Sequence, residues 1–412
     1  MLQRVPAVSG RFQMSCQRTS LWRRIRVAAA MLGLGMIICG IGATAAHAAN
    51  PDDEVFFSRL AKRVEPNRIG RPDRLDFYIS YFRQQMVNDP RLFAFHVDVE
   101  YDKPHNRVAL RGYIELSETH VALHRFLDSL GFHNQADHIV DLPAKKLGSK
   151  RYGLVRTTHS FCYNQPAGTQ EVVTDCLLGE PLYLLDSSDN GYLLCHSADG
   201  YIGFIHADDV QQINAKQFQS YQSGEHACLT RDIKTSDIAL PVGANLKCVE
   251  SSKATVQLQL PSGTLVAVPR DACHVVSGKV PGRLQHVLKV ARGLLETPYL
   301  WGGKTSSGID CSGLVQTAFA AEGVWLPRDS SQQVYLGRLT ATRWQRKLVR
   351  PGDTLYFVGH YGKIRHTALY LGGGRYIEAA GGKVRISSMV PGTDGYDPRR
   401  SGAFVFAKRL LD

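Results

Sequence analysis

The sequence predicts an α+β protein that is divided into several small domains. A chain of 412 residues is longer than one ordinary domain, and its 44% hydrophobic residues are enough to build several cores. Residues 54–87, 284–295 and 311–323 show the apolar spacing of amphipathic helices. Residues 150–278 instead show short apolar runs separated by Gly, Asp, Asn and Ser, which are typical of strands and turns. Separate helical and strand-rich stretches indicate the α+β class.

Residues 1–48 have the features of an export signal. A basic flank at 23–26 precedes an apolar run at 27–44, and small residues at 46–48 follow with the spacing of a cleavage site. An uncleaved membrane anchor is the alternative, because the apolar run approaches the length that spans a bilayer. The composition favours cleavage, so we expect an exported protein that has no membrane attachment afterwards.

The formal charge of +12 does not indicate a nucleic-acid partner. Six of the 49 basic residues lie within residues 1–48, where no acidic residue occurs. The rest of the chain therefore has only a mild excess of basic over acidic residues. The sequence has no dense tract of Lys and Arg interleaved with aromatic residues. We therefore expect no nucleic-acid partner, and a mild positive charge that suits a polyanionic surface.

Nine cysteines fit an oxidising compartment outside the cytoplasm. Cys16 and Cys39 fall within the predicted export signal, and Cys311 stands alone in the C-terminal part of the chain. The other six form two groups of three, for which we expect disulfides, with buried thiols as the alternative. Six cysteines allow 15 connectivities, among which the sequence does not choose. The six are Cys162, Cys176, Cys195, Cys228, Cys248 and Cys273.

Residues 50–148 predict a small α/β domain. Two helices are followed by two alternating runs around a turn, which predict a hairpin, and then by a third helix and a short strand. This β-β-α-β order is similar to that of BON-type domains, and we expect no chemistry there. The predicted elements are helices at 54–64, 73–87 and 117–131 and strands at 93–99, 108–114 and 139–143.

Residues 149–216 and 217–280 predict two small β-domains that are related by an internal repeat. The first resembles bacterial SH3-like barrels, and the second is a more divergent copy of it. The matched segments are 176–185 and 199–205 in the first copy and 240–246 and 260–266 in the second, and residues 279–282 are the predicted linker that follows.

The last predicted domain, residues 281–412, has a cysteine at the start of a helix. Asp310 is a good N-cap residue, and the apolar stripe after it ends at Gly323. Cys311 then lies in the first helical turn, where the helix dipole and the unpaired amides lower the pKa of a thiol. The same amides hold a developing oxyanion. This pattern predicts a nucleophile, which also needs a base.

Five motifs in this domain resemble the NlpC-type family of papain-like bacterial cell-wall cysteine peptidases. The likeness covers residues 284–408, with the motifs in order and at familiar spacing. The motifs are Pro-Tyr-Leu-Trp-Gly-Gly (298–303), Asp-Cys-Ser-Gly-Leu (310–314), and the runs at 326–333, 351–357 and 365–372.

The resemblance implies a catalytic set of four residues. Cys311 is the nucleophile, and His366 is the base. Tyr299 matches a tyrosine whose hydroxyl supports the oxyanion, with aromatic packing as the alternative. The third, orienting position is usually His, sometimes Asn or Gln, but here it is Glu378, which accepts a hydrogen bond from the imidazole and raises the pKa of the base. The alternative is that Glu378 is an acid at the rim and that a carbonyl or water orients His366.

The resemblance also implies how substrate is recognised. Family members with a preceding SH3-like domain cut the bond between γ-D-glutamate and the diamino acid, and some require a free L-alanine amino end. Asp310 and Ser312 match positions that contact this amino end, as does Tyr201 from the first β-domain, whose alternative role is packing. An acid is expected near Gln165, and a glutamine carries no charge for an ammonium group.

The resemblance therefore implies an exported cysteine peptidase that hydrolyses peptidoglycan stem peptides at the γ-D-glutamyl-L-diamino acid bond. The alternatives are an inactive wall-binding protein, or an amidase or acyltransferase that uses the same Cys-His site. We expect a monomer in the periplasm or associated with the cell wall. We expect no cofactor and no metal, because the last domain has a single cysteine and no histidine pair at ligand spacing.

Overall fold

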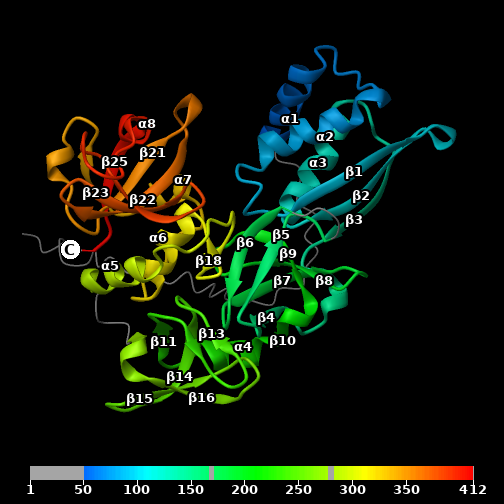
Figure 1. Cartoon of the computed structure of the whole chain (residues 1–412). Coiled ribbons are helices and arrows are strands. Elements are labelled where there is room, and N and C mark those ends of the chain that lie inside the picture. Colours follow the sequence, from blue (N-terminus) through cyan, green and yellow to red (C-terminus); the bar gives the residue numbers. More distant parts are fainter. Residues whose placement is uncertain (1–50, 167–170, 277–282, 412) are drawn as a thin grey trace, which may run out of the picture. The chain divides into compact units, whose positions relative to one another are not determined.

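The computed structural model describes residues 51–166, 171–276 and 283–411 (Figure 1). The predicted export signal at 1–48 and the predicted linker at 279–282 lie outside the described residues. No helix in these described segments has the length and apolar character that are needed to cross a membrane.

The first described region contains the predicted β-β-α-β order. β1 and β2 pair antiparallel, β2 and β3 pair parallel, and α3 makes the crossover between them. Figure 1 shows α1, α2 and α3 beside this three-stranded sheet, and all three helices contribute to one core with it. The elements are α1 (Pro51–Val64), α2 (Leu75–Met86), β1 (Phe95–Asp102), β2 (Arg107–Ile114), α3 (Ser117–Ser129) and β3 (Gln135–Asp141). The likeness to BON-type domains stays a prediction.

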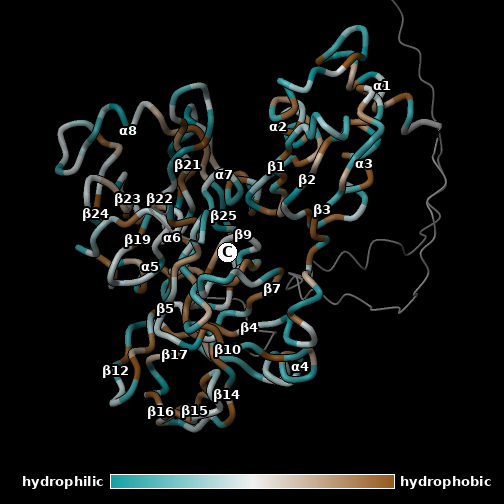
Figure 2. The backbone as a smooth tube through the Cα atoms, turned by 90° about the vertical axis from the view of Figure 1, so that its right-hand side faces the viewer, coloured by the Kyte–Doolittle hydropathy of each residue, from teal (hydrophilic) through white to brown (hydrophobic). Residues whose placement is uncertain are grey.

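The buried stripe on α3 is narrow. Val121 is 47% exposed, whereas Leu123, Phe126 and Leu127 are fully buried and Ala122 completes the packed face. A helix that covers a small sheet buries a narrow stripe, and Val121 falls outside it. Hydrophobic and hydrophilic residues alternate along most of β1 (Figure 2), because one face of this strand meets the helices.

The next region forms two antiparallel sheets. The order β10-β4-β7-β8-β9 in the first sheet corresponds to β17-β11-β14-β15-β16 in the second. The seven-stranded sheet is ordered β10-β4-β7-β8-β9-β5-β6, and the five-stranded sheet is ordered β16-β15-β14-β11-β17. The bounds of the first sheet are β4 (Tyr152–Val155), β5 (His159–Tyr163), β6 (Val172–Leu177), β7 (Pro181–Ser187), β8 (Tyr192–His196), β9 (Ile202–His206) and β10 (Val210–Ile213). After α4 (Ala215–Gln222) follow β11 (His226–Leu229), β12 (Ile233–Lys234), β13 (Ala239–Leu240), β14 (Asn245–Ser251), β15 (Thr255–Gln259), β16 (Leu265–Pro269) and β17 (Cys273–Val276).

Turn glycines support the internal repeat that the sequence predicts. Gly179 and Gly243 have φ of +80° and +84° and stand two residues before β7 and β14. Gly200 and Gly263 have φ of +86° and +91° and stand two residues before β9 and β16. Glycine adopts this left-handed conformation without steric cost, so both copies use the same turns. The hairpins β5–β6 and β12–β13 occupy the same place in the two copies, and the likeness to SH3-like barrels stays a prediction.

The six cysteines of these two sheets are buried free thiols, which is the alternative to the expected disulfides. Cys162 on β5 and Cys176 on β6 have their sulfur atoms 3.5 Å apart. This separation is longer than the ~2.0 Å of a disulfide bond. The thiols contribute to the cores of the sheets in which they lie.

The C-terminal region packs two helices against a six-stranded antiparallel sheet ordered β20-β25-β21-β22-β23-β24. Every residue of α6 is buried, because this helix lies against β22 and β23. The helices are α5 (Leu284–Gly293), α6 (Cys311–Ala320), α7 (Ser330–Gln333) and α8 (Pro398–Ala403). The strands are β18 (Lys304–Thr305), β19 (Gly308–Ile309), β20 (Arg338–Thr342), β21 (Thr354–Val358), β22 (Ile364–Gly372), β23 (Arg375–Ala380), β24 (Lys383–Ser388) and β25 (Phe404–Arg409).

Candidate active site

Cys311 is the first residue of α6, as the sequence predicts. Asp310 caps the helix, since its Oδ1 accepts a hydrogen bond from the backbone N–H of Gly313 at 2.7 Å. A Cβ at position 313 would lie 2.2 Å from the carbonyl oxygen of Gly303, so only glycine fits there. The close approach of the preceding loop to the first helical turn therefore fixes the position of the thiol.

The thiol of Cys311 is protonated at neutral pH. Burial and the nearby charge of Asp310 raise its pKa to about 12, although the backbone N–H groups of Thr367 and Ser312 act in the opposite direction. The expectation that the helix terminus lowers the pKa of this thiol is wrong for the net effect, because the loss of hydration outweighs the amides. Attack on a carbonyl therefore requires a base to remove the proton.

His366 and Glu378 form a buried pair, and the backbone N–H of Thr367, the residue after His366, contacts Cys311. They lie on the adjacent strands β22 and β23, and His366 Nε2 is 2.6 Å from Glu378 Oε2. The side chain of Glu378 is 1% exposed, which excludes the alternative of an acid at the rim. Because an ionised carboxylate only accepts, Nε2 carries the proton and Nδ1 keeps its lone pair. Nδ1 is thus the atom that remains to take a proton from the thiol.

Glu378 is ionised because its neighbours are donors and cations. Its Oε1 accepts hydrogen bonds from Ser387 Oγ at 2.8 Å and from Arg385 Nη2 at 3.2 Å. Arg400 Nε lies 3.4 Å from Oε2. Burial raises the pKa of Glu378, but the hydrogen bond from His366 and the charge of Arg400 have the larger, opposite effect. The pKa is lowered from its ordinary value to about 2. The sequence analysis did not identify these three supporting residues.

The imidazole of His366 is neutral at neutral pH. Burial lowers its pKa below the ordinary value, and the charges of Arg400 and Arg385 add to this effect. Glu378 acts upward, as the sequence predicts, but its contribution is smaller than that of burial. A neutral imidazole with a free lone pair is the form that accepts a proton.

Tyr299 lies beside Cys311. It forms a bridge with Ile309, two residues before Cys311, and its side chain is half-buried. Burial raises its pKa to about 12, and the charges of Cys311 and Asp310 act in the same direction. The hydroxyl therefore keeps its proton and is available as a donor.

Asp310 and Ser312 belong to an internal network with Arg328, whose side chain is 1% exposed. The guanidinium donates to both carboxylate oxygens of Asp310, at 2.6 and 3.1 Å, and to Ser312 Oγ at 3.0 Å. It also donates to Thr174 Oγ1 of the seven-stranded sheet at 3.2 Å. The polar atoms predicted to bind a substrate amine thus already have partners. Arg328 lies in the motif at 326–333 but was not predicted as a site residue.

Tyr201 comes from the seven-stranded sheet and meets the C-terminal region at α7. Its hydroxyl donates to Gln332 Oε1 at 3.2 Å, and the side chain is 2% exposed. The guanidinium of Arg91 lies 5.3 Å from the ring centroid and forms an ion pair with Asp329. The structure therefore places Tyr201 at the α7 end of the site, in a packed position. The sequence carried no signal for the contribution of Arg91.

Gln165 is exposed and lies in the loop between β5 and β6. The far end of this loop adjoins the active-site region, because a Cβ on Gly302 would lie 2.3 Å from Val172 Cγ1. Residues 167–170 of the loop lie outside the described residues. The role of Gln165 in substrate binding stays a prediction.

A buried lysine joins the seven-stranded sheet to the loop before Cys311. Lys304 Nζ lies 3.0 Å from Glu180 Oε1 and 3.7 Å from Asp199 Oδ2, and its side chain is 4% exposed. The backbone N–H of Lys304 donates to Asp175 Oδ2 at 3.2 Å. Charges from two regions of the chain therefore meet next to the site, a contact that the local sequence pattern did not indicate.

Residues 296–395 match the NlpC/P60 family. Dipeptidyl-peptidase 6 of Lysinibacillus sphaericus is 27% identical over 250 residues, which cover 55% of this chain and 88% of that protein. The gamma-D-glutamyl-L-lysine dipeptidyl-peptidase of Bacillus subtilis (strain 168) is 34% identical over 24% of this chain and 32% of its own length. The peptidoglycan endopeptidase RipB of Mycobacterium tuberculosis (strain ATCC 25618 / H37Rv) is 31% identical over 31% of this chain and 54% of its own length.

One solved structure shares the fold beyond the C-terminal region. An NlpC/P60 family protein from Bacillus cereus ATCC 10987 aligns with a TM-score of 0.54 at 17% identity, over 63% of this chain and 100% of that chain. Because 63% of the chain is about twice the share of residues 281–412, the shared fold includes part of the strand-rich region.

Proposed function

Because the C-terminal domain of this chain belongs to the NlpC/P60 family, we propose that the chain is a cysteine peptidase that cuts peptidoglycan stem peptides between γ-D-glutamate and an L-diamino acid. The observation that carries the proposal is the buried His366–Glu378 pair, with the backbone N–H of the next residue, Thr367, at the thiol of Cys311, the first residue of α6. The relatives' names, which include a gamma-D-glutamyl-L-lysine dipeptidyl-peptidase and a peptidoglycan endopeptidase, support the substrate class.

Acylation begins when His366 Nδ1 takes the thiol proton as the sulfur of Cys311 attacks the γ-carbonyl carbon of D-glutamate. The backbone N–H groups at the start of α6 and the hydroxyl of Tyr299 stabilise the oxyanion. Nδ1–H then protonates the nitrogen of the diamino acid, the C–N bond breaks, and a thioester remains. Glu378 accepts the Nε2–H bond throughout and favours the transient imidazolium.

Deacylation uses the same residues in reverse. His366 Nδ1 takes a proton from water as the water oxygen attacks the thioester carbonyl, and the oxyanion again meets the α6 amides. The C–S bond breaks, and the sulfur receives the proton from Nδ1. The products are a γ-carboxylate on D-glutamate and the regenerated thiol.

The substrate amino end is recognised weakly in this scheme. Asp310 is already paired with Arg328, and Gln165 stands where the family resemblance expects an acid. Neither residue supplies an uncompensated negative charge for an ammonium group. We therefore expect stem peptides with free and blocked L-alanine to be cut at similar rates, with Tyr201 shaping the cleft through α7.

The remaining regions serve delivery and wall binding. Residues 1–48 act as a cleaved export signal, and the two repeated sheets act as SH3-like wall-binding units in a monomer at the periplasm or cell wall. The pairing of Glu378 with His366 weakens the case for an inactive wall-binding protein, since the departure at this position was its main support.

Digestion of purified muropeptides, followed by mass spectrometry, tests the proposal. The wild-type protein is expected to yield products cut after γ-D-glutamate, and Cys311→Ala to reduce the rate by about a thousand-fold or more. Ser262→Ala, on an exposed turn, is the matched control and keeps full activity. Absence of products from the wild type contradicts the enzyme, whereas products from Cys311→Ala contradict the nucleophile. Substrates acetylated at L-alanine test the weak amine recognition.

A further inference from the structure

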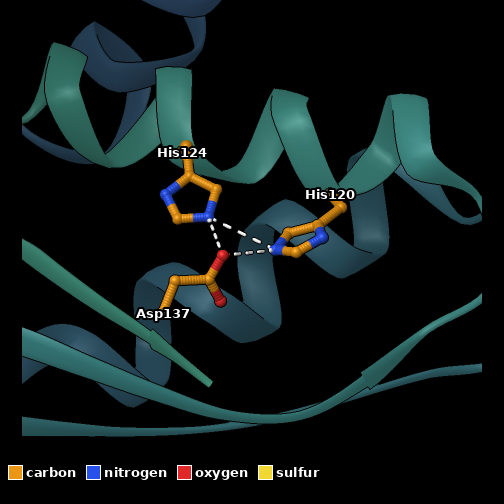
Figure 3. Close-up of side chains that lie close together, drawn as sticks. All are labelled: His120, His124 and Asp137. Carbon is orange, nitrogen blue, oxygen red and sulfur yellow. Dashed lines mark hydrogen bonds and ion pairs between the residues drawn. The ribbon is translucent and has the colours of Figure 1, made fainter. Parts of the chain in front are cut away.

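A second histidine–carboxylate cluster lies in the first region, away from the peptidase residues. His120 and His124 are one helical turn apart on α3, and Asp137 extends toward them from β3 (Figure 3). Asp137 Oδ2 lies 3.0 Å from the Nε2 atom of each histidine, and these two nitrogens are 3.3 Å apart. Among the described residues, His120, His124 and Asp137 are the one group of three His, Cys, Asp or Glu residues whose ligand atoms lie close enough together to hold a metal ion.

The three ligand atoms have the spacing of a metal coordination sphere. In a tetrahedron with bonds of ~2.0 Å, as for zinc with histidine and aspartate, neighbouring ligand atoms are about 3.3 Å apart. The observed separations of 3.0, 3.0 and 3.3 Å form a triangle of this size. The three atoms therefore match one face of a tetrahedron, which would leave a fourth position for another ligand.

The Nδ1 atom of each histidine has an acceptor other than Asp137. His120 Nδ1 lies 2.7 Å from the carboxylate oxygen Asp141 Oδ1, so Nδ1 carries the proton. The amide nitrogen of Gln135 donates to the carbonyl of Phe132 at 2.7 Å, which identifies Oε1 as the Gln135 atom that faces His124 Nδ1. His124 Nδ1 therefore donates to Gln135. Metal-binding histidines commonly donate their second nitrogen to a carboxylate or an oxygen in this way.

The consequence is a convergence of acceptors. In neutral imidazoles whose single proton is on Nδ1, the two Nε2 lone pairs and Asp137 Oδ2 point at one another. Asp137 Oδ1 is held separately by the backbone N–H of Ile139 at 3.0 Å, which aims Oδ2 at the histidines. Three converging lone pairs repel one another unless a cation lies among them.

We propose that His120, His124 and Asp137 bind a divalent transition-metal ion of the zinc type. Two imidazoles and one carboxylate are ligands that such ions favour over magnesium or calcium. The side chains of the three residues are 13%, 28% and 34% exposed, so an ion reaches the site from solvent. The ion clamps the crossover helix α3 to β3, an edge strand with mostly exposed side chains that pairs only with β2 among the described strands.

Titration of the full-length protein with Zn²⁺ alone, after removal of metal by a chelator, tests the proposal. Calorimetry is expected to show one equivalent per chain, and Co²⁺ to give the intense visible absorption of a tetrahedral site. Both His124→Ala and Asp137→Asn should weaken binding by at least about a hundred-fold. His133→Ala and His138→Ala, exposed histidines in the same region, are the matched controls and should bind as the wild type does.

Two results would overturn the proposal. One is the absence of a stoichiometric site in the wild type, which means that the two histidines bind protons instead and pair with Asp137 as imidazolium ions. The other is unchanged binding in both ligand variants, which means that the metal binds elsewhere. Circular dichroism shows whether each variant is folded, and Asp137→Asn, which preserves the shape of an exposed side chain, is the variant that keeps the test valid if His124→Ala unfolds.

Discussion

Two histidine–carboxylate arrangements in this molecule differ in what surrounds the carboxylate. Glu378 is buried and meets Arg385, Arg400 and Ser387 in addition to His366. Asp137 is partly exposed and meets two imidazoles and a backbone N–H. A carboxylate that is already balanced by cations holds one imidazole in place. A carboxylate that shares its oxygen with two imidazole lone pairs has the composition of a metal site.

The comparison predicts that removing Glu378 has the largest effect. Glu378→Ala should reduce kcat by about 10²- to 10⁴-fold, because His366 loses the acceptor that fixes its tautomer and two arginines lose their partner. Glu378→Gln keeps a carbonyl acceptor and should stay within about tenfold of the wild type. Steady-state kinetics on a defined stem peptide measure both variants. Equal losses in the two variants would show that the carboxyl oxygen does not orient His366.

Acid should remove the stability that the ionised Glu378 contributes. The pKa of Glu378 is lowered to about 2 in the folded protein from an ordinary value of 4.5, so its ionisation stabilises the protein above pH 4.5 and this contribution disappears toward pH 2. We expect the advantage of the wild type over Glu378→Gln to shrink by roughly 3 kcal/mol across this range. Urea unfolding at several pH values measures it, and a constant difference would contradict the buried ion pair.

Asp141 offers a smaller change at the other cluster. Asp141→Asn keeps an acceptor for His120 Nδ1 but removes the charge that strengthens the ligand. We expect Zn²⁺ affinity to fall by about tenfold, with unchanged stoichiometry. Asp98→Asn, on the exposed edge of β1, is a suitable control. Calorimetry that shows no change at Asp141 would remove the proposed orienting role.

The smallest effect is expected when metal is removed during catalysis. A chelator should change the rate of muropeptide cleavage by less than about twofold, because Cys311 and His366 act without a metal in the proposed steps. It should also lower the melting temperature, since bound metal stabilises the folded form. Loss of cleavage on chelation that zinc restores would show that the two clusters are coupled.

The sequence predicts the proposed reacting residues more readily than their surroundings. Cys311 and His366 stand in ordered motifs, and the family resemblance puts Glu378 at the third position, so these three predictions need local pattern alone. Arg328 and Lys304 act through partners more than a hundred residues away, Thr174 and Glu180, which only the folded chain reveals. The helix terminus suggested a lowered pKa for Cys311, whereas complete burial of α6, a tertiary property, raises it.

Dependence on contacts between distant residues also explains why the sequence did not predict the proposed metal cluster. The four-residue spacing of His120 and His124 on a predicted helix was readable and places both on one face. Asp137 lies in a different element and joins them only because β3 pairs parallel with β2 beneath α3. The internal repeat of the two sheets was also readable, because the matched segments contain Gly179 and Gly243 at corresponding places before β7 and β14. The features that predict no metal, a single cysteine and no histidine pair at ligand spacing, belong to the last domain, whereas this cluster lies in the first region.

The burial of Lys304 makes the C-terminal domain a poor freestanding module. In the whole chain, this ammonium group rests against carboxylates of the seven-stranded sheet, and Arg328 donates to the same sheet. Separating the two would leave Glu180 and Asp199 without their counter-charge and open the loop that precedes the nucleophile to water. Loss of a partner from a buried pair costs about 3–5 kcal/mol. The seven-stranded sheet and the peptidase domain should therefore melt together in a single transition. The catalytic geometry should be lost when this sheet unfolds.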